Sequence, residues 1–412
     1  MDELQMVRDL ISERPPPRPE VIAAARARLS GRTPPRRPAA PRRRPPGRHR
    51  ALRVGVPVAA AVTAAAVIAT VVVQGGTAPH PAANLGVYQP PPGTAGTAGG
   101  SARDMLLAVA RTAAKNAAGI AAPPAGTRYW VTSSVAGNFV RVGPFSDRYV
   151  ILEKTAAQYW GALNPQAMSQ DYNQRLGVQL ASTADRQAWR RDGSPSSWDV
   201  NQETSASDPE GYTGGGGAEI RAGLGKPYAF FGQTGGPTFV IGHRSFSASG
   251  LRELPADPAQ LKALLLTGYS TVEGFASVED YLWMSVPGVL TMPVTPQVRA
   301  GLYQLLAGLP GVRDLGSVQD AAGQSGVAVA LDSHQTHCGH WNTVSSGTDH
   351  WTFTSCQVQD RLVVDPGTGQ LLSEELRYLS LPPGQSWSPP GGLFSYQIFG
   401  ATKWSSASPP KN

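Results

Sequence analysis

The longest apolar stretch of the chain runs from Val54 to Val73 and contains no charged residue. A helix of about twenty residues, rising about 1.5 Å per residue, spans the roughly 30 Å hydrocarbon core of a bilayer. Soluble core helices rarely run this far without a polar face. The pattern therefore predicts a transmembrane helix at residues 54–74.

Arginines decide the expected orientation of this helix. Residues 1–53 contain fourteen Arg and five acidic residues, a net charge of +9, whereas the whole chain carries +7. Positive flanks stay in the cytoplasm, so we expect the N-terminus inside and the larger C-terminal part outside. A cleaved signal peptide would need a far longer charged region than usual, which favours an uncleaved anchor. The arginines expected at the inner membrane surface are Arg42, Arg43, Arg44, Arg48, Arg50 and Arg53.

The segments on either side of the predicted span differ in composition. Residues 1–53 predict a cytoplasmic tail with two short helices, Met1–Ser12 and Glu20–Leu29, before a Pro/Arg-rich stretch. Such a basic stretch binds anionic headgroups, and the apolar positions of the two helices can also dock on a cytoplasmic protein partner of residues 1–30. Residues 75–100 are rich in Gly, Ala, Pro and Thr and predict a flexible extracytoplasmic linker.

Residues 101–405 predict an extracytoplasmic α+β domain. Helices are expected to start at the capping residues Ser101, Asp257, Ser277 and Thr295. Runs of β-branched and aromatic residues predict strands, and Asp192-Gly193 between two such runs predicts a hairpin. The order of helix, strands, helices and strands indicates an antiparallel sheet with packed helices. The expected strands are 129–135, 139–142, 149–154, 186–191, 196–200, 312–318, 326–331, 361–364, 370–378 and 396–404.

Charge and motifs exclude several functions. The residues after Arg53 sum to −2, because the tail carries more than the whole net charge, so nothing supports nucleic-acid binding by the domain. No Gly-x-Ser-x-Gly elbow occurs, and the sequence around Gly225-Lys226 lacks the spacing of a phosphate-binding loop. We therefore expect no catalytic role and no cofactor.

Histidines and cysteines gather in one segment before residue 361, which we expect to form a loop. Both cysteines of the chain lie there, Cys338 and Cys356, with seventeen residues between them. In an oxidising compartment this spacing favours a disulfide. The alternative is a zinc or copper site. Its expected ligands are His334, His337, His340 and His350.

Four tryptophans suggest a second candidate site. They can line an apolar groove, or they can pack in the core and across strands. Both interpretations are open from the sequence. The residues are Trp130, Trp160, Trp189 and Trp198.

Several motifs of the domain resemble one family when taken with the basic tail and the Ala/Val-rich span. They are Leu254-Pro255-Ala256-Asp257-Pro258, Arg299-Ala300-Gly301-Leu302-Tyr303 with Leu309-Pro310-Gly311-Val312, Asp320-Ala321-Ala322-Gly323 with Gly326-Val327-Ala328-Val329, and Asp365-Pro366-Gly367-Thr368-Gly369 with Leu371-Leu372. The chain resembles actinobacterial single-span membrane proteins to which no activity is assigned. The resemblance implies a curved half-barrel, similar to lipoprotein carriers and to periplasmic regulators of envelope-stress signalling.

The topology is also similar to that of membrane-bound anti-sigma factors. The zinc-binding His-x3-Cys-x2-Cys pattern of those proteins is absent from residues 1–53. We expect a single-pass protein that binds or senses an extracytoplasmic ligand and signals to a cytoplasmic partner. Two alternatives are a lipid or glycolipid carrier of the cell envelope, and a metal-dependent hydrolase built on the segment from His334 to Cys356.

Overall fold

The computed structural model describes residues 85–90, 100–116, 123–144, 146–164, 167–199, 219–226, 228–233, 239–269, 275, 277–345, 348–381, 388 and 391–410. The predicted tail helices, the span at 54–74 and its arginine flank lie outside the described residues. Among the described residues, no helix has both the length and the apolar character to cross a bilayer. The α+β class of the domain is confirmed.

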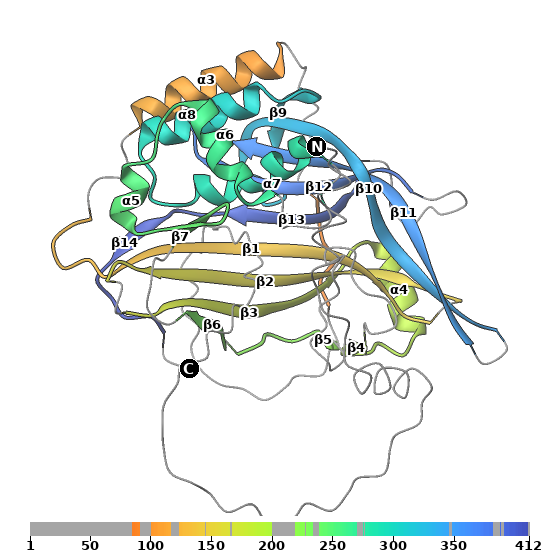
Figure 1. Ribbon diagram of the computed structural model, residues 1–412. Helices are drawn as coiled ribbons and strands as arrows, with labels where there is room; N and C mark the ends of the chain where they lie inside the picture. Colours follow the sequence, from red (N-terminus) through yellow and green to blue (C-terminus); the bar gives the residue numbers. More distant parts are fainter. Residues whose placement is uncertain are drawn as a thin grey trace, which may run out of the picture. The chain divides into compact units, whose positions relative to one another are not determined.

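A ten-stranded antiparallel sheet is the centre of the domain, with the strand order β6-β3-β2-β1-β13-β12-β11-β10-β9 and with β14 pairing β1 (Figure 1). The sheet is curved, and β10 and β11 sweep across the other strands in this view. Its strands are β1 (Tyr129–Val142), β2 (Tyr149–Ala162), β3 (Ser169–Leu180), β6 (Tyr228–Gln233), β9 (Val312–Gln319), β10 (Ser325–Ser345), β11 (Thr348–Val364), β12 (Leu371–Ser380), β13 (Leu393–Phe399) and β14 (Lys403–Ser405).

Two halves of the chain meet in this sheet. The pairing of β1 with β13 joins the early strands to the late ones, in a register from Ser134 opposite Phe399 to Asn138 opposite Ser395. Two small two-stranded sheets lie outside the main sheet. They consist of β4 (Ser197–Asp199) with β5 (Glu219–Arg221), and of β7 (Phe239–Ile241) with β8 (Arg244–Phe246).

Most helices begin where the capping residues predict. The hydroxyl of Ser101 accepts a hydrogen bond from the backbone N–H of Asp104, and Asp257, Ser277 and Thr295 cap in the same way. These four expected helix starts are confirmed. The physical reason is that a capping side chain accepts a hydrogen bond from a backbone amide that has no partner within the helix. The helices are α3 (Ala102–Lys115), α4 (Thr183–Arg191), α5 (Ala248–Arg252), α6 (Pro258–Leu266), α7 (Val278–Leu290) and α8 (Pro296–Ala307).

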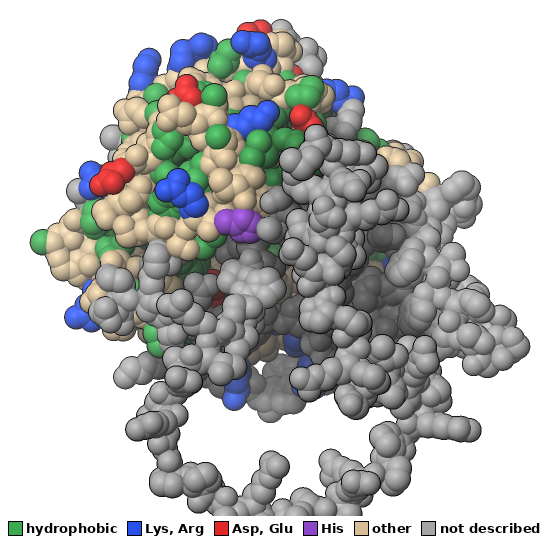
Figure 2. Space-filling model, viewed as in Figure 1, with side chains coloured by type: hydrophobic (Ala, Val, Ile, Leu, Met, Phe, Trp, Pro, Cys, Tyr) green, Lys and Arg blue, Asp and Glu red, His purple; other side chains and the backbone are tan. Residues whose placement is uncertain are grey.

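The main core lies between α3, α6, α7, α8 and one end of the sheet. Helix α3 buries Leu106 and Val109 there and turns basic residues outward, so Lys and Arg side chains gather over it in Figure 2. Two hydrogen bonds tie the helices to the strands. The indole N–H of Trp130 donates to the carbonyl of Thr291 over 3.1 Å, and the phenol of Tyr303 donates to the carbonyl of Gly369 over 3.0 Å.

The hairpin expected around Asp192-Gly193 is wrong. Residues 183–191 form helix α4, which Ser182 caps. The amide of Gly193 donates to the carbonyl of Arg190, and the amide of Ser194 donates to that of Trp189. With φ of 81° at Gly193, these bonds form a Schellman motif, so the Asp-Gly pair ends a helix instead of turning a hairpin.

The strands are longer and more numerous than the sequence predicts. Strand β1 is continuous through residues 136–138, and β3 and β6 were not expected. The segment expected to be the histidine and cysteine loop is a long hairpin of β10 and β11. Pairing with neighbouring strands supplies backbone hydrogen bonds that override weak local preferences.

We predict that Gly137→Ala destabilises the fold. A Cβ at Gly137 would lie 2.2 Å from Cζ of Tyr396, whose buried ring covers this glycine across the β1–β13 pair. Displacing the ring should lower the free energy of unfolding by roughly 1–3 kcal/mol, measured by chemical denaturation. The control Gly223→Ala, which has no atom within 4 Å of its Cβ, should change stability far less. Equal effects of the two variants would contradict the prediction.

Candidate functional site: a polar band across the sheet

The helix-facing side of the sheet carries two separate apolar clusters. At one end, Trp130 and Leu362 belong to the main core under the helices. At the other end, Val140, Ile151 and Val178 pack around α4. The strand positions between these clusters belong to neither of them.

Polar and small side chains occupy that middle. Residues directly opposite each other on paired strands share one face of the sheet. The row that contains the core residue Leu362 therefore lies on the helix-facing side. It consists of Arg175, Thr155, Ala136, Gln397, Glu374 and Leu362, on six neighbouring strands.

Two flanking rows have the same character. One places Asn173, Ala157 and Ser134 in line, and the other places Glu153, Asn138 and Ser395 in line. We call these six residues, together with Arg175, Thr155, Ala136, Gln397 and Glu374, the polar band. Except for the buried Ser134, its side chains are half-buried, so they are neither packed in a core nor open to bulk solvent.

Carboxyl groups of the band and its margins have perturbed pKa values. Burial raises the pKa of Glu374 to about 8, and the negative charge of the nearby Asp360 adds to this. Burial also raises the pKa of Asp171, which lies beside the band on β3, to about 6. Burial raises the pKa of Glu153, while Arg175, with Nε 3.7 Å from Oε1 of Glu153, opposes the shift.

These groups can make many hydrogen bonds to a ligand. At neutral pH Glu374 is largely protonated, so it offers both a donor and an acceptor. Thr155, Asn138 and Asn173 add hydroxyl and carboxamide groups. Clustered carboxyls of raised pKa are common at functional sites, although buried ion networks show them as well.

A charged cluster on the opposite face has a structural role. The carboxylate of Glu375 is fully buried and accepts hydrogen bonds of 2.8 Å from the guanidinium of Arg377 and from the amide of Ala321. Arg361 adds a third charge, 3.7 Å away. The carboxylate is thus saturated by the protein itself, which ties β12 to the turn after β9.

The structure separates the four tryptophans of the expected groove. Trp130 is in the main core, while Trp160 packs with Val131 and Tyr172 on the other face of the sheet. Trp189 and Trp198 lie together near α4, where the indole N–H of Trp198 donates to the phenol of Tyr149 over 2.7 Å. Each of the four is at most 9% exposed, so they serve as packing residues in three clusters.

The histidine and cysteine segment is described only in its backbone. The side chains of His334, His337, His340, His350 and Cys338 lie outside the described ones, so the metal site and the disulfide both stay predictions. The register sets Cys356 opposite Thr336, and Cys338 falls at a bulge two residues further on. Neighbouring positions on paired strands are compatible with a disulfide. Among side chains that the structure does describe, no group of three His, Cys, Asp or Glu is placed to bind a metal ion.

Comparison with known protein families, with curated proteins and with solved structures finds no match. The described fold defines the chain only as an α+β domain on one curved antiparallel sheet. The family resemblance of the sequence motifs stays an expectation.

We predict a disulfide between Cys338 and Cys356. The intact mass of the purified full-length protein should increase by two hydrogens on reduction, and native mass spectrometry should show no metal adduct. Closing a loop of this size stabilises the fold by about 3 kcal/mol in the chain-entropy model, so reduction should also lower Tm. Two free thiols and a retained metal ion would favour the histidine site instead.

We predict that Glu374 makes stability fall as the pH rises. In the unfolded chain a Glu titrates near pH 4.3, and in the folded protein Glu374 titrates at about 8. Between these values the folded state holds a proton that the unfolded state has lost, so its contribution is present at pH 5 and lost by pH 8. Glu374→Gln, which is neutral throughout, should remove roughly 1–3 kcal/mol of this decline.

Denaturation midpoints measured from pH 5 to pH 8 check this. The matched control is Glu253→Gln at an exposed position, which should keep the wild-type slope. If Glu374→Gln kept that slope as well, the raised pKa would be refuted.

Proposed function

We propose that this chain is a single-pass membrane protein whose extracytoplasmic domain binds an uncharged, hydroxyl-rich ligand on the polar band. The observation that carries the proposal is the row from Arg175 to Glu374, which crosses five strands between two apolar clusters. A half-barrel curvature of the sheet, as the sequence motifs imply, belongs to this proposal and would wrap the band around the ligand.

The placement of the band supports binding over packing. Burying a polar group without a partner costs about 1–3 kcal/mol in proteins, so a sheet face that only packs is apolar. Here Thr155 and Asn138 lie in the interior of β2 and β1, and the ends of these two strands carry core residues on the same face. Asn173 lies in line with them on β3. A row of half-buried hydrogen-bond donors and acceptors in this position can bind water, and a polar ligand can replace that water by making the same hydrogen bonds.

Charge narrows the class of ligand. Within the band Glu153 is acidic and Arg175 is basic, and Asp171 and Asp360 at its margins add two further carboxyl groups. This excess of negative charge disfavours fatty-acid carboxylates and phosphorylated headgroups. Neutral carbohydrate fits better, because hydroxyl groups pair with carboxyl, carboxamide and hydroxyl partners. A glycolipid fits through its sugar, whereas an acyl chain would require the apolar lining that the band lacks.

The membrane and signalling parts of the proposal rest on the sequence. The apolar segment at 54–74 and the fourteen arginines before it support an inside N-terminus. Occupancy of the domain would then have to favour one arrangement of span and tail, since a ligand shifts only an equilibrium between states that it binds unequally. The proposal includes no catalytic step and no cofactor.

Binding by the full-length protein in detergent tests the ligand class. Thermal-shift and calorimetric titrations with neutral oligosaccharides should show saturable binding, and a fatty acid should neither bind nor compete. The double variant Thr155→Val with Asn173→Leu should weaken oligosaccharide binding by at least about tenfold, because it removes two hydrogen-bonding groups worth about 1 kcal/mol each.

The matched control is Lys154→Met, which alters the opposite face of β2 next to Thr155. It should leave the affinity unchanged. Binding of the fatty acid, with no binding of the oligosaccharides, would contradict the proposal and favour a lipid carrier. Equal losses in Lys154→Met and the double variant would show that the band does not contact the ligand.

A further inference from the structure

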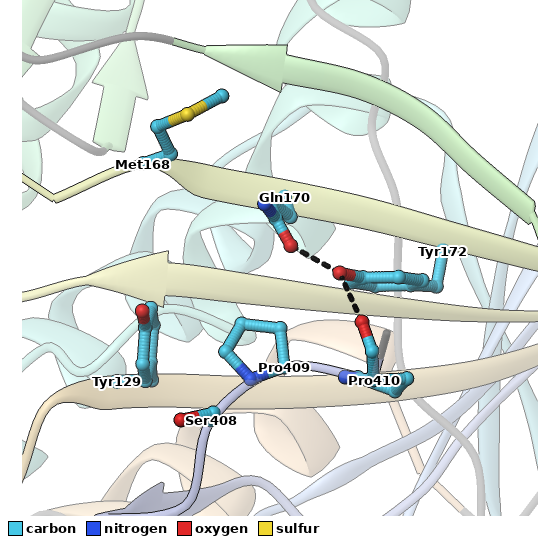
Figure 3. Close-up of a pocket in the computed structure, with 7 residues that line it drawn as sticks. All are labelled: Tyr129, Met168, Gln170, Tyr172, Ser408, Pro409 and Pro410. Carbon is cyan, nitrogen blue, oxygen red and sulfur yellow. Dashed lines mark hydrogen bonds between the residues drawn. The ribbon is translucent and has the colours of Figure 1, made fainter. Parts of the chain in front are cut away.

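A pocket lies on the face of the sheet opposite the polar band. Asn173, in the band, is opposite Ala157, so the next residue pair, Tyr172 and Gln158, lies on the other face. The pocket has a volume of about 430 Å³ and forms where the C-terminal segment meets β1 and β3. Figure 3 shows its lining: Tyr129, Met168, Gln170, Tyr172, Ser408, Pro409 and Pro410.

The C-terminal diproline, Pro409-Pro410, forms part of the lining of this pocket. In Figure 3, Pro409 lies between the side chains of Tyr129 and Tyr172. The phenol of Tyr172 is 2.8 Å from the carbonyl oxygen of Pro410 and also reaches the carboxamide oxygen of Gln170. A phenol has one proton, so it donates to one of these two acceptors at a time.

Aromatic packing fixes the walls of the pocket. The ring of Tyr129 meets Trp160 edge to face at 5.7 Å, and Trp160, Val131 and Tyr172 form one buried cluster. At the rim, Met168 is 41% exposed. Rigid aromatic walls with one hydroxyl donor suit an extended proline segment, whose rings stack on aromatic faces and whose carbonyls have no partner within the segment.

We propose that the surface formed by Tyr129, Gln170 and Tyr172 is a binding groove for proline-rich peptides. The chain's own Ser408–Pro410 segment lies against it in cis and leaves the pocket open beside it. The partner in trans is an extended peptide with consecutive prolines, which binds by displacing the tail. The seated diproline, the hydroxyl donated to its carbonyl and the open volume beside it carry this inference. It is independent of the ligand proposed for the polar band.

The test uses the tail itself as the probe. A fluorescent peptide of residues 406–412, Ser-Ala-Ser-Pro-Pro-Lys-Asn, is titrated by anisotropy against the full chain and against a chain ending at Ser405. The shortened chain should bind it at least tenfold more tightly than the full chain, because its groove is empty. A peptide with both prolines replaced by alanine should bind the shortened chain at least fivefold more weakly.

Two substitution variants distinguish an effect on peptide binding from an effect of truncation on folding. In the full chain, Pro409→Ala with Pro410→Ala should free the groove without shortening the protein and should raise the affinity for the probe. In the shortened chain, Tyr172→Phe keeps the ring, removes the hydroxyl and should weaken binding about fivefold. The proposal is overturned if the alanine peptide binds as well as the probe, if neither altered tail raises the affinity, or if Tyr172→Phe has no effect.

Discussion

The pairing of β1 with β13 is the contact on which the domain depends. These strands are more than 250 residues apart in the chain, and their five-residue register makes one sheet from two sets of strands. Tyr396 lies over Gly137 at the centre of this pair, so the junction fits only because position 137 has no side chain. The polar band crosses the same junction, through Ala136 and Gln397. Fold and candidate site therefore share one long-range constraint.

The two faces of the sheet carry different kinds of side chains. One face carries the helices at both ends and the polar band between them, where the half-buried Glu374 has a raised pKa. The other face carries a charge network around Glu375 and an aromatic pocket at the C-terminal segment. Adjacent residues of one strand, Glu374 and Glu375, thus have opposite roles, since alternate side chains of a strand point to opposite faces.

Part of the fold could be predicted from the sequence, and most of the site could not. Strand runs such as 312–318 were found because β-branched and apolar residues mark them locally. The polar band was missed because Thr155, Asn173 and Gln397 are unremarkable alone and meet only through the register. Bulges at Leu176 and Leu372 decide which residues of β3 and β12 share a face with Ala136. Gly177, with φ of 98°, marks the first bulge in the sequence, whereas no glycine marks the second.

The sequence by itself determined the elements whose interactions close within a few residues. Ser101 with Asp104 starts α3, and the amide of Gly367 bonds the side chain of Asp365 in the turn before β12. Helix α4 was missed although its signals are local, since Ser182 with Asp185 starts it and Gly193 ends it. Only the tertiary structure decided that Trp130 and Trp160 lie on opposite faces and which polar residues form a band. The physical reason is range: a cap or turn has its partners within four residues, whereas strand pairing and burial depend on residues distant in the chain.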